Sequence, residues 1–432
     1  MRLRDEAVGL LQQLIRLNTV NPPGNETIAA HALRDYLASH GVACELFART
    51  PERANLVARI PGGDGPSLAF LSHTDTVVAD ASEWSRDPWS GDLADDHVWG
   101  RGALDMKNQA AASAVAFASL AREGFRPAGD LVFIAAADEE VGKSFGLEWL
   151  CQEHPDAVRV DYAINEGGGE RVQLGGSTYY LCASAEKMTA PFRLRVHGRS
   201  GHASMPGIAD NALVKAAPLI QALGAYRPEP ELGPEVEGFL DAVLGERPPA
   251  KQVLTRLAEL DPLAVELIEP LLSLTFSPTI IAASERRNVI PAICDVTVDC
   301  RLLAGKTPED VEPLIHGVLA GNGADSGDYE IEFLERWGGT RSSMETPLWR
   351  AIEGWVGATE PGAKVAPICC AGFTDSHWLR DAFGTVAYGF FPMRTMDPEL
   401  AARLIHSADE RVHVDDLELG VEFLRELARS LG

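Results

Sequence analysis

The sequence predicts a doubly wound α/β domain that is interrupted by a smaller α+β domain of ferredoxin-like type. Apolar strands alternate with helices up to about residue 187, which is the pattern of an α/β domain. The order predicted for the next part, β-α-β-β-α-β, is that of a ferredoxin-like sandwich. At 432 residues the chain is too long for one ordinary core. We therefore expect one domain from residues 1–187 and 338–432, with residues 188–337 inserted into it.

The first elements of the α/β domain follow from apolar spacing and turn residues. Apolar side chains at helical spacing predict a helix over residues 5–17, which ends before Asn21-Pro-Pro-Gly24. A second helix is expected from Glu26 to His40. Two strands follow, at Asn55–Ile60 and Ser67–Leu71.

A continuous apolar run from Asp130 to Ala137 predicts a strand that is covered on both faces, as in a parallel sheet. Before it, the Trp-rich segment Trp84–Trp99 is expected to be a loop, and Ala110–Ala121 a helix of small residues. Tyr162–Ile164 is a further short strand. In open α/β sheets the ligand site lies at the carboxyl ends of the strands. The polar residues that follow these strands are therefore candidates for a site.

The inserted domain is predicted from alternating strands and two helices. Its first strand, Pro191–His197, alternates apolar and polar residues, as a half-exposed strand does. No form is predicted for the polar, proline-rich segment from Arg227 to Ala250. The remaining ranges are helices 211–223 and 308–319 with strands 279–283, 294–302 and 329–334 in the insertion, then helices 347–356 and 415–431 with strand 385–389.

The composition limits the classes of partner and the compartment. A formal net charge of −25 argues against nucleic acid and against an anionic membrane as partners. The seven cysteines form no Cys-x-x-Cys pair, so we expect reduced thiols in a cytoplasmic protein. We expect no signal peptide, because the N-terminal residues lack an apolar core, and no apolar stretch is long enough to span a bilayer.

Histidines and carboxylates follow the predicted strands at several places along the chain. His73 ends a strand and has Asp75 beside it, as in sites where a carboxylate orients a ligating ring. Taken singly, each such residue is more simply a helix cap, a turn acid or a buried histidine. Together, two histidines and three carboxylates suit zinc, manganese or cobalt, and five ligands fit two metals that share one carboxylate. The other candidates are Asp105, the pair Glu139 and Glu140, Glu166 and His406.

The motifs around these residues, in this order, resemble those of the M20 family of metallopeptidases. That family includes aminoacylases, carboxypeptidases, acetylornithine deacetylase and succinyl-diaminopimelate desuccinylase. The resemblance covers nearly the whole chain and implies a zinc-peptidase-like catalytic domain with an inserted lid and dimerisation domain. It also implies a homodimer formed through the lid. The motifs are His73-Thr-Asp75, Gly100-Arg-Gly-Ala-Leu-Asp105-Met-Lys107, Asp138-Glu139-Glu140, Asn165-Glu166-Gly167, Gly201-His202-Ala203 and His406.

The resemblance implies which residues bind the two metals. One metal is bound by His73, Glu166 and the shared Asp105, and the other by Asp105, Glu140 and His406. Zinc is the expected metal, with cobalt or manganese as alternatives. The resemblance further implies a non-proline cis peptide bond, for which Asp105–Met106 is the candidate.

The resemblance also implies the chemistry. Glu139 is implied as the general base, which takes a proton from a water bridging the metals and passes it to the leaving amine after the hydroxide attacks an amide carbonyl. Asp75 is implied to support the His73 ring. His202 matches a lid histidine that reaches across a dimer to the oxyanion, although alone it would be a simple loop histidine.

Further residues match positions that face the substrate. Asn288 and Arg301 match lid positions that hold a substrate carboxylate, and the alternative for Arg301 is a surface arginine on a strand. Gly372 and Phe373 belong to a substrate loop in which Phe373 replaces a small or hydroxylic residue. His377 stands where an arginine is common. This departure argues against a desuccinylase that needs a second acid-binding arginine there.

We therefore expect a metal-dependent hydrolase of small N-acyl amino acids or short peptides with a free C-terminal carboxylate. A dipeptidase or aminopeptidase is the alternative within the same class. A non-catalytic binding protein would lack the base or some ligands, but Glu139 and all five ligand candidates are present. A nucleotide-binding enzyme is disfavoured because Gly167-Gly-Gly169 is not a phosphate-binding fingerprint.

Overall fold

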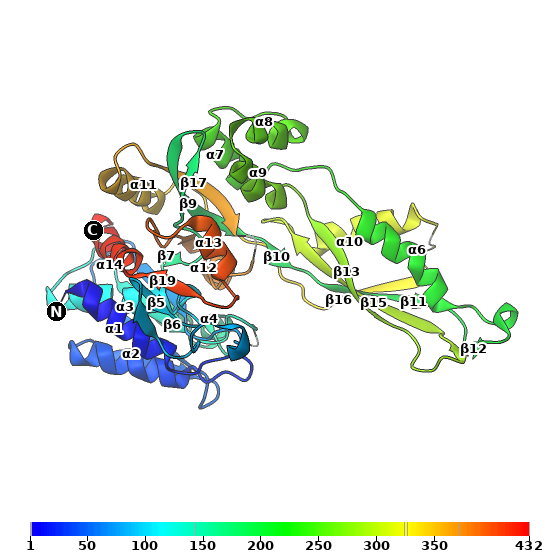
Figure 1. The fold of residues 1–432 in the computed structure, drawn as a ribbon, viewed down its shortest axis with the longest axis horizontal. Helices are drawn as coiled ribbons and strands as arrows, with labels where there is room; N and C mark the ends of the chain where they lie inside the picture. The colour runs from blue at the N-terminus through cyan, green and yellow to red at the C-terminus, as the bar shows by residue number, and fades with distance from the viewer. Residues whose placement is uncertain (1, 143, 324, 326, 371, 432) are drawn as a thin grey trace. The chain divides into compact units, whose positions relative to one another are not determined.

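The computed structural model describes residues 2–142, 144–323, 325, 327–370 and 372–431, and it divides into two compact units (Figure 1). Unit 1 consists of Met1–Ser184, Ser342–Cys370 and Thr374–Gly432. Unit 2 consists of Ala185–Arg341 and Ala371–Phe373. The functional division into a catalytic domain and a lid domain, with boundaries at residues 187 and 338, stays a prediction.

Unit 1 is built on a mixed sheet of nine strands. Its strands are β1 (Cys44–Ala48), β2 (Ala54–Ile60), β3 (Leu68–His73), β6 (Leu131–Ala136), β7 (Tyr162–Asn165), β8 (Arg171–Leu174), β9 (Ser177–Glu186), β17 (Lys364–Cys370) and β18 (Val386–Gly389). The order is β1-β2-β6-β3-β7-β18-β9-β17, and β8 pairs with β9. β6, β3, β7 and β18 run parallel to one another, so their carboxyl ends meet at one edge of the sheet.

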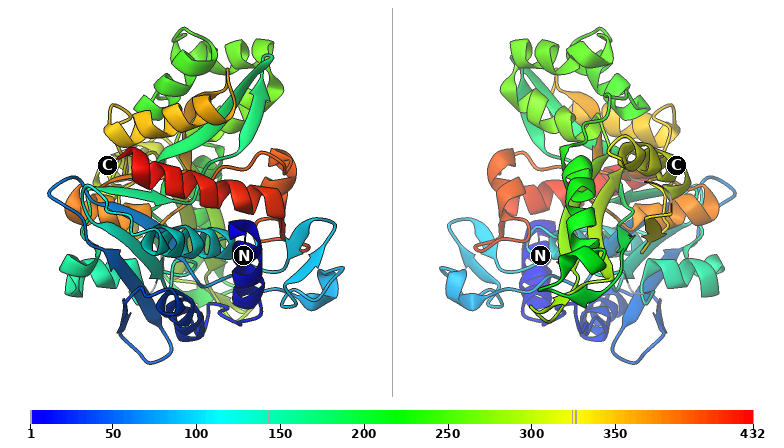
Figure 2. Two further views of the ribbon diagram at one scale, coloured as in Figure 1. Left: turned by 90° about the vertical axis from the view of Figure 1, so that its left-hand side faces the viewer. Right: turned by 90° about the vertical axis from the view of Figure 1, so that its right-hand side faces the viewer.

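Helices cover both faces of this sheet. Phe70 and Phe133 pack into a core with α1, α2, α3, α11, α13 and α14, whereas Leu71 and Ile134 pack into a second core with α4, α5 and α12. This two-sided burial confirms the predicted doubly wound α/β fold. Figure 2 shows α14, in red, which belongs to the first of these two helical layers. The helices are α1 (Leu3–Ile15), α2 (Thr27–Ser39), α3 (Lys107–Arg122), α4 (Leu147–Glu153), α5 (Pro155–Val158), α11 (Pro347–Thr359), α12 (Ser376–Phe383), α13 (Pro398–Leu404) and α14 (Val414–Ser430).

The prediction that Trp84–Trp99 is only a loop is wrong. After a short 3-10 helix, η1 (Ala81–Glu83), it forms a hairpin of β4 (Asp92–Ala94) and β5 (His97–Trp99), and β19 (Arg411–His413) pairs with β5. The two residues of the hairpin turn, Asp95 and Asp96, have φ values of 52° and 58°. Positive φ at both central positions is the geometry of the tightest hairpins, and aspartate tolerates it.

Unit 2 has the predicted ferredoxin-like order. The chain runs β11 (Phe192–His197), α6 (Ala212–Ala225), β13 (Thr275–Ala282), β15 (Ile293–Leu302), α10 (Pro308–Ala320) and β16 (Tyr329–Phe333), with β13 on β15, β15 on β11 and β11 on β16. β10 (Met188–Thr189) also pairs with β15. The alternating side chains of β11 and β15 pack against α6 and α10.

Other short elements complete unit 2. The proline-rich segment for which no form was predicted contains α7 (Pro234–Val243), and η3 (Ala250–Gln252), α8 (Val253–Leu260), α9 (Pro262–Ile268) and η4 (Glu269–Leu271) follow it. β12 (Gly201–His202) pairs with β14 (Val289–Ile290), and η2 (Pro206–Ile208) lies between β12 and α6.

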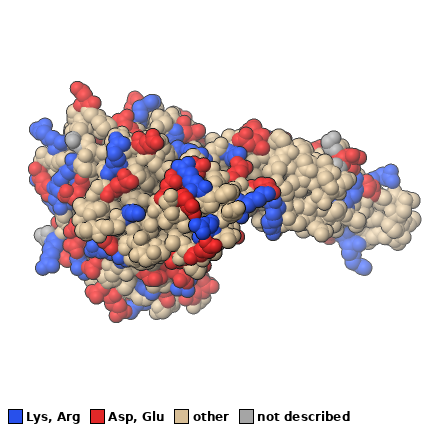
Figure 3. All heavy atoms as spheres, turned by 90° about the horizontal axis from the view of Figure 1, so that it is seen from above, with Lys and Arg blue, Asp and Glu red and all other residues tan. Residues whose placement is uncertain are grey.

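The surface and the helices bear on the expected partners. Acidic and basic side chains are interspersed on the face shown in Figure 3. Within the described residues, every helix is too short or too polar to cross a membrane.

The centre of the sheet allows a test of the fold. Phe133 on β6 is fully buried and its ring centroid lies 6.2 Å from that of Phe117 on α3. Phe133→Ala should lower the free energy of unfolding by about 3–5 kcal/mol, because a cavity forms between strand and helix. Urea unfolding of both proteins measures the difference. Leu93→Ala, at a side chain that is 54% exposed, is the control and should change it by less than about 0.5 kcal/mol. Equal effects would contradict the assigned core.

Candidate metal centre

The polar candidates of unit 1 come together at the carboxyl edge of the sheet. His73 is the last residue of β3, and its register partner on β6 is Ala136. Asp138, Glu139 and Glu140 begin two residues after the end of β6, and Glu166 immediately follows β7. Because β6, β3 and β7 are parallel neighbours, the turns after them lie side by side.

Asp105 lies between the two histidines. It precedes α3, and its peptide bond to Met106 is cis, as expected from the resemblance. Its Oδ1 is 3.0 Å from Nε2 of His73, and its Oδ2 is 3.0 Å from Nε2 of His406. One carboxylate thus presents a different oxygen to each imidazole, which is the arrangement of a ligand shared by two cations.

The remaining carboxylates divide between the two histidines. Nε2 of His73 lies 3.7 Å from Oε2 of Glu166 and 3.9 Å from Oε2 of Glu139. Nε2 of His406 lies 3.2 Å from Oε2 of Glu140. Two ligand atoms that are each about 2.1 Å from one tetrahedral zinc are roughly 3.4 Å apart. The spacing of these nitrogen and oxygen atoms therefore fits a divalent cation on each side of Asp105.

The electrostatics also fit a cation. Burial raises the pKa of Glu166 to about 7, and the negative charges of Asp105 and Glu140 add to this increase, while His73 opposes it. Burial likewise raises the pKa of Glu139 well above its ordinary value. Oε1 of Glu140 is buried and has no hydrogen-bond partner among the described residues. A positive ion would relieve both the repulsion between these carboxylates and the unpaired oxygen.

In the metal-free chain the histidines supply the positive charge. Burial would lower the pKa of His73, but Glu166, Asp105 and Asp75 raise it well above its ordinary value. Hydrogen bonds to Asp105 and Glu140 raise the pKa of His406 to about 10. Both rings must lose these protons before their nitrogens can bind a metal.

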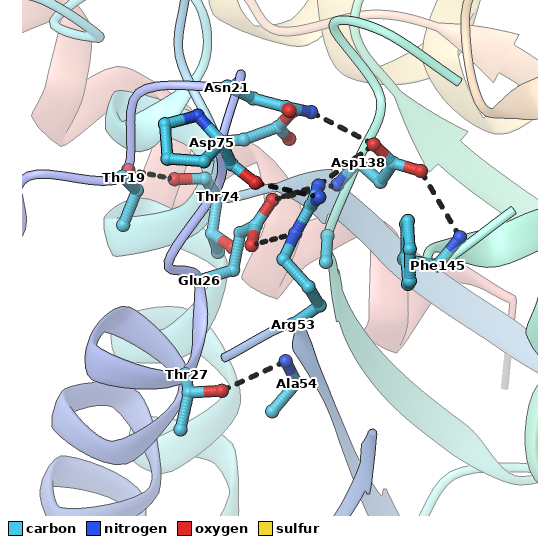
Figure 4. A network of polar contacts seen from close by, with 12 residues as sticks. Thr19, Asn21, Glu26, Thr27, Arg53, Ala54, Thr74, Asp75, Asp138 and Phe145 are labelled. Carbon is cyan, nitrogen blue, oxygen red and sulfur yellow. Dashed lines mark hydrogen bonds and ion pairs between the residues drawn. The ribbon is translucent and has the colours of Figure 1, made fainter. Parts of the chain in front are cut away.

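Asp75 contacts the centre without presenting a free oxygen to it. Its Oδ1 is 3.5 Å from Nδ1 of His73 and accepts the Glu139 N–H at 3.2 Å, whereas its Oδ2 accepts the Glu140 N–H at 3.1 Å. Asn21 Nδ2 also donates to Oδ2, at 2.9 Å (Figure 4). The backbone carbonyl of Asp75 lies 3.1 Å from Nδ1 of His73, so Asp75 orients the ring chiefly through its backbone, and its carboxylate holds the turn after β6.

The candidates of unit 2 do not form a single cluster. His202 on β12 is the register partner of Val289 on β14, and the Ala203 N–H donates to the Asn288 carbonyl, so His202 and Asn288 are neighbours. Arg301 is near the far end of β15, roughly 26 Å along the strand from Ile293 at about 3.3 Å per residue. Its Nε donates to Oδ1 of Asp299 at 3.0 Å.

The last candidates follow β17. Gly372 and Phe373 are half-buried in the segment before α12. His377, in the first turn of α12, is buried, and its ring packs edge-on against Trp378 with centroids 4.9 Å apart.

Sequence reasoning missed the residue that holds the loop before Asp105. Glu410 is fully buried, and its carboxylate accepts hydrogen bonds from the Arg101 side chain and from the backbone N–H groups of Gly102, Leu104 and Asp105. Glu410 is four residues after His406, so one segment supplies an imidazole and anchors the shared carboxylate. The available signal was Arg101, because an arginine in a Gly-Arg-Gly loop beside a buried strand needs an acidic partner.

The chain is similar to known proteins over nearly its whole length. The profile of Peptidase family M20/M25/M40 matches residues 69–430. A succinyl-diaminopimelate desuccinylase from Magnetococcus marinus is 27% identical over 440 residues, covering 99% of this chain and 98% of the relative. An M20 family metallo-carboxypeptidase from Sulfolobus solfataricus has a similar fold, with a TM-score of 0.74, 18% identity and 99% of both chains covered. Human carnosine dipeptidase 1 gives 0.66 at 16% identity, covering 99% of this chain and 96% of the other.

Glu410 can be tested by its removal. Glu410→Ala should lower the free energy of unfolding by about 3–5 kcal/mol, because the Arg101 guanidinium is left buried without its acid. Urea unfolding gives the value. The matched control is Asp415→Ala, which breaks an exposed pair with Arg4 and should cost less than about 1 kcal/mol. A loss in Glu410→Ala as small as in the control would refute the anchoring role.

The raised pKa of His406 predicts proton release on metal binding. Since that pKa is about 10, the ring is protonated near neutral pH and must lose its proton to bind zinc. Titration calorimetry in two buffers of different ionisation enthalpy counts the protons. Wild-type protein should release about one proton more per chain than His406→Ala. If both proteins release the same number of protons, zinc binding does not remove a proton from His406.

Proposed function

The chain belongs to peptidase family M20/M25/M40 and is a hydrolase of that family, and from this premise we propose that it cleaves the amide bond of small N-acyl amino acids or of short peptides with a free C-terminal carboxylate. The observation that carries the proposal is Asp105, whose two oxygens face two different histidines at 3.0 Å. This arrangement favours a centre of two divalent cations, which suits amide hydrolysis.

We propose that His73, Glu166 and Asp105 hold one cation, and that Asp105, Glu140 and His406 hold the other. Zinc suits this mixture of imidazole and carboxylate, and cobalt or manganese could replace it. When bound, the cations polarise the amide carbonyl and lower the pKa of water. Asp75 keeps the His73 ring in place from behind.

Glu139 is proposed as the general base. Its side chain is buried beside His73, and burial raises its pKa well above the ordinary value, toward the operating pH at which a base works best. It accepts a proton as the water oxygen bonds to the carbonyl carbon. It then donates that proton to the amide nitrogen as the carbon–nitrogen bond breaks, which yields a carboxylate and an amine.

The proposed substrate contacts come from unit 2 and from the segment after β17. His202 is assigned to the oxyanion, Asn288 and Arg301 to the substrate carboxylate, and Gly372 and Phe373 to the substrate side chain or acyl group. Because Asn288 and Arg301 lie toward opposite ends of β15, they can hold one carboxylate only if they come from different subunits of the proposed homodimer. A homodimer through unit 2 is supported by β13, an edge strand of the described sheet on which Ile280 and Ile281 are 62% and 50% exposed.

Two observations limit which acyl groups the proposed substrate carries. The name of the Magnetococcus marinus relative describes removal of a succinyl group, which supports an N-acyl substrate. His377, however, is buried against Trp378 where an arginine would offer a second carboxylate-binding group. We therefore favour an acyl group without its own carboxylate.

A substrate panel tests the proposal. Purified protein is assayed with N-acyl amino acids, N-succinyl amino acids and free dipeptides, after separate loading with zinc, cobalt or manganese. We expect hydrolysis of uncharged N-acyl amino acids to have the highest kcat/KM. Preference for free dipeptides would instead indicate the dipeptidase or aminopeptidase alternative, and tight binding without hydrolysis a binding protein.

The base assignment predicts a separation of turnover from metal content. Glu139→Gln should lower kcat by about 10²–10⁴-fold, because the proton acceptor is lost. Its metal content, measured by plasma emission spectroscopy, should stay near that of wild type. The companion variant Glu140→Gln should lose metal as well as activity. If Glu139→Gln keeps the turnover of wild type, Glu139 is not the general base.

A further inference from the structure

Buried polar side chains form a network that binds the turn carrying Glu139 and Glu140. Figure 4 shows its members Asn21, Glu26, Arg53, Asp75 and Asp138. We infer that Arg53, a residue of this network, is a positioning residue for the reaction, acting through Glu26 and Asp138 to fix that turn. Arg53 precedes β2 and Glu26 precedes α2, so neither belongs to the segments of the metal centre. The inference rests on the proposed function, in which Glu139 is the base and Glu140 a metal ligand.

The Arg53 guanidinium donates four hydrogen bonds within this network. Its Nε and Nη2 donate to the two oxygens of Glu26 at 2.6 and 2.8 Å, and Nη2 also donates to Oδ1 of Asp138 at 2.8 Å. Nη1 donates to the Pro23 carbonyl at 3.1 Å. The three charged side chains are 7%, 0% and 1% exposed. A planar fork thus joins two buried carboxylates that would otherwise repel each other.

The surroundings are shaped for an arginine. Gly24 has a φ of +81°, and a Cβ atom there would lie 2.3 Å from Cζ of Arg53. The Phe145 ring centroid lies 4.8 Å from the same atom on another side. A lysine has the charge but not the planar fork, so it could not keep both hydrogen bonds to Glu26 together with the bond to Asp138.

The network holds three successive backbone amides of the turn. The Asp138 N–H donates to Glu26, and the next two N–H groups, of Glu139 and Glu140, donate to Asp75. Asn21 donates to both Asp75 and Asp138, at 2.9 Å each, and so joins the two carboxylates. Arg53 completes the network. It donates to Glu26, which accepts the Asp138 N–H, and it also donates to the Asp138 side chain.

The held conformation is one that the turn would not adopt readily by itself. Asp138 has a φ of 66°, in the left-handed region that non-glycine residues seldom occupy. Its side chain is fixed by Arg53 and Asn21 at Oδ1 and by the Phe145 N–H at Oδ2. If Arg53 lets the turn relax, Glu139 and Glu140 move together, although Arg53 contacts neither of them. A shift of about 1 Å at catalytic groups can lower turnover roughly 100-fold.

The test compares Arg53→Lys and Glu26→Gln with a matched control, Arg122→Lys. Arg122 makes a forked pair with Glu6 in the same unit, but Glu6 does not contact the turn. The measurements are the melting temperature, kcat and KM for the best substrate of the panel, and the Co²⁺ affinity by calorimetry. Arg53→Lys should lower kcat per metal-loaded chain, and the Co²⁺ affinity, by about 10–100-fold. KM should stay close to wild type, because ground-state binding is untouched.

Each outcome decides the inference. Arg122→Lys should have a lower melting temperature than wild type but the same kcat and Co²⁺ affinity. If Arg53→Lys behaves in the same way, the positioning role is overturned. If Arg53→Lys does not fold, Glu26→Gln decides, because it breaks one arm of the fork and keeps an acceptor for the Asp138 amide. A lower kcat and weaker Co²⁺ binding in that variant support the inference, and wild-type values overturn it.

The two proposals can fail separately. If wild-type protein hydrolyses none of the amides in the panel, the proposed function fails. The Co²⁺ affinity of the same variants still decides the role of Arg53, since Glu140 stands on the turn that Arg53 is inferred to hold. Weaker Co²⁺ binding in Arg53→Lys then supports the inference, and unchanged binding overturns it.

Discussion

Repulsion between largely buried carboxylates is the constraint on which the carboxyl edge of the sheet in unit 1 depends. Glu139, Glu140, Glu166 and Asp105 are gathered around two imidazoles, and burial raises the pKa of Glu139 and of Glu166. Without a metal, the charge is offset by protons held on His73 and His406. Such a cluster is costly unless positive charge is supplied, so its presence at this edge of the sheet indicates a cation centre.

The chain holds these acids in place with a second set of acids. Glu410 binds the loop before Asp105 and is neutralised by Arg101, while Asp75 and Glu26 bind the turn after β6. Arg53 neutralises Glu26 and also pairs with Asp138. Backbone N–H groups and arginines thus take up the supporting carboxylates. The negative potential that remains is concentrated on the proposed metal ligands.

The fold and the centre differed in how far the sequence predicts them. Apolar runs such as Asp130–Ala137 predict the central strands, because burial on both faces leaves a local signature. β17 was missed because it contains Pro367, which is tolerated there since β17 lies at the end of the strand order. Of the proposed ligands, His73, Glu140 and Glu166 end or follow strands that the sequence predicts, whereas Asp105 precedes α3 and His406 follows α13, and the role of these two came from the motif resemblance. The pairs Arg53–Asp138 and Arg101–Glu410 join residues 85 and 309 positions apart, and such pairing of buried charges leaves no local pattern.

The proposed metal ligands and the supporting carboxylates differ in the hydrogen bonds that their oxygens accept, and their positions in the sequence do not show this difference. His73 and Asp75 are two residues apart and resemble a pair of ligands, but both oxygens of Asp75 accept backbone N–H groups. In the described part of the chain, the oxygens of Asp105 face imidazoles instead, and Oε1 of Glu140 faces no donor. An oxygen whose lone pairs are taken by amides is a poor ligand, whereas an unsatisfied buried oxygen is stabilised by a cation. Asp75 therefore belongs with the supporting acids, and the shared ligand is Asp105.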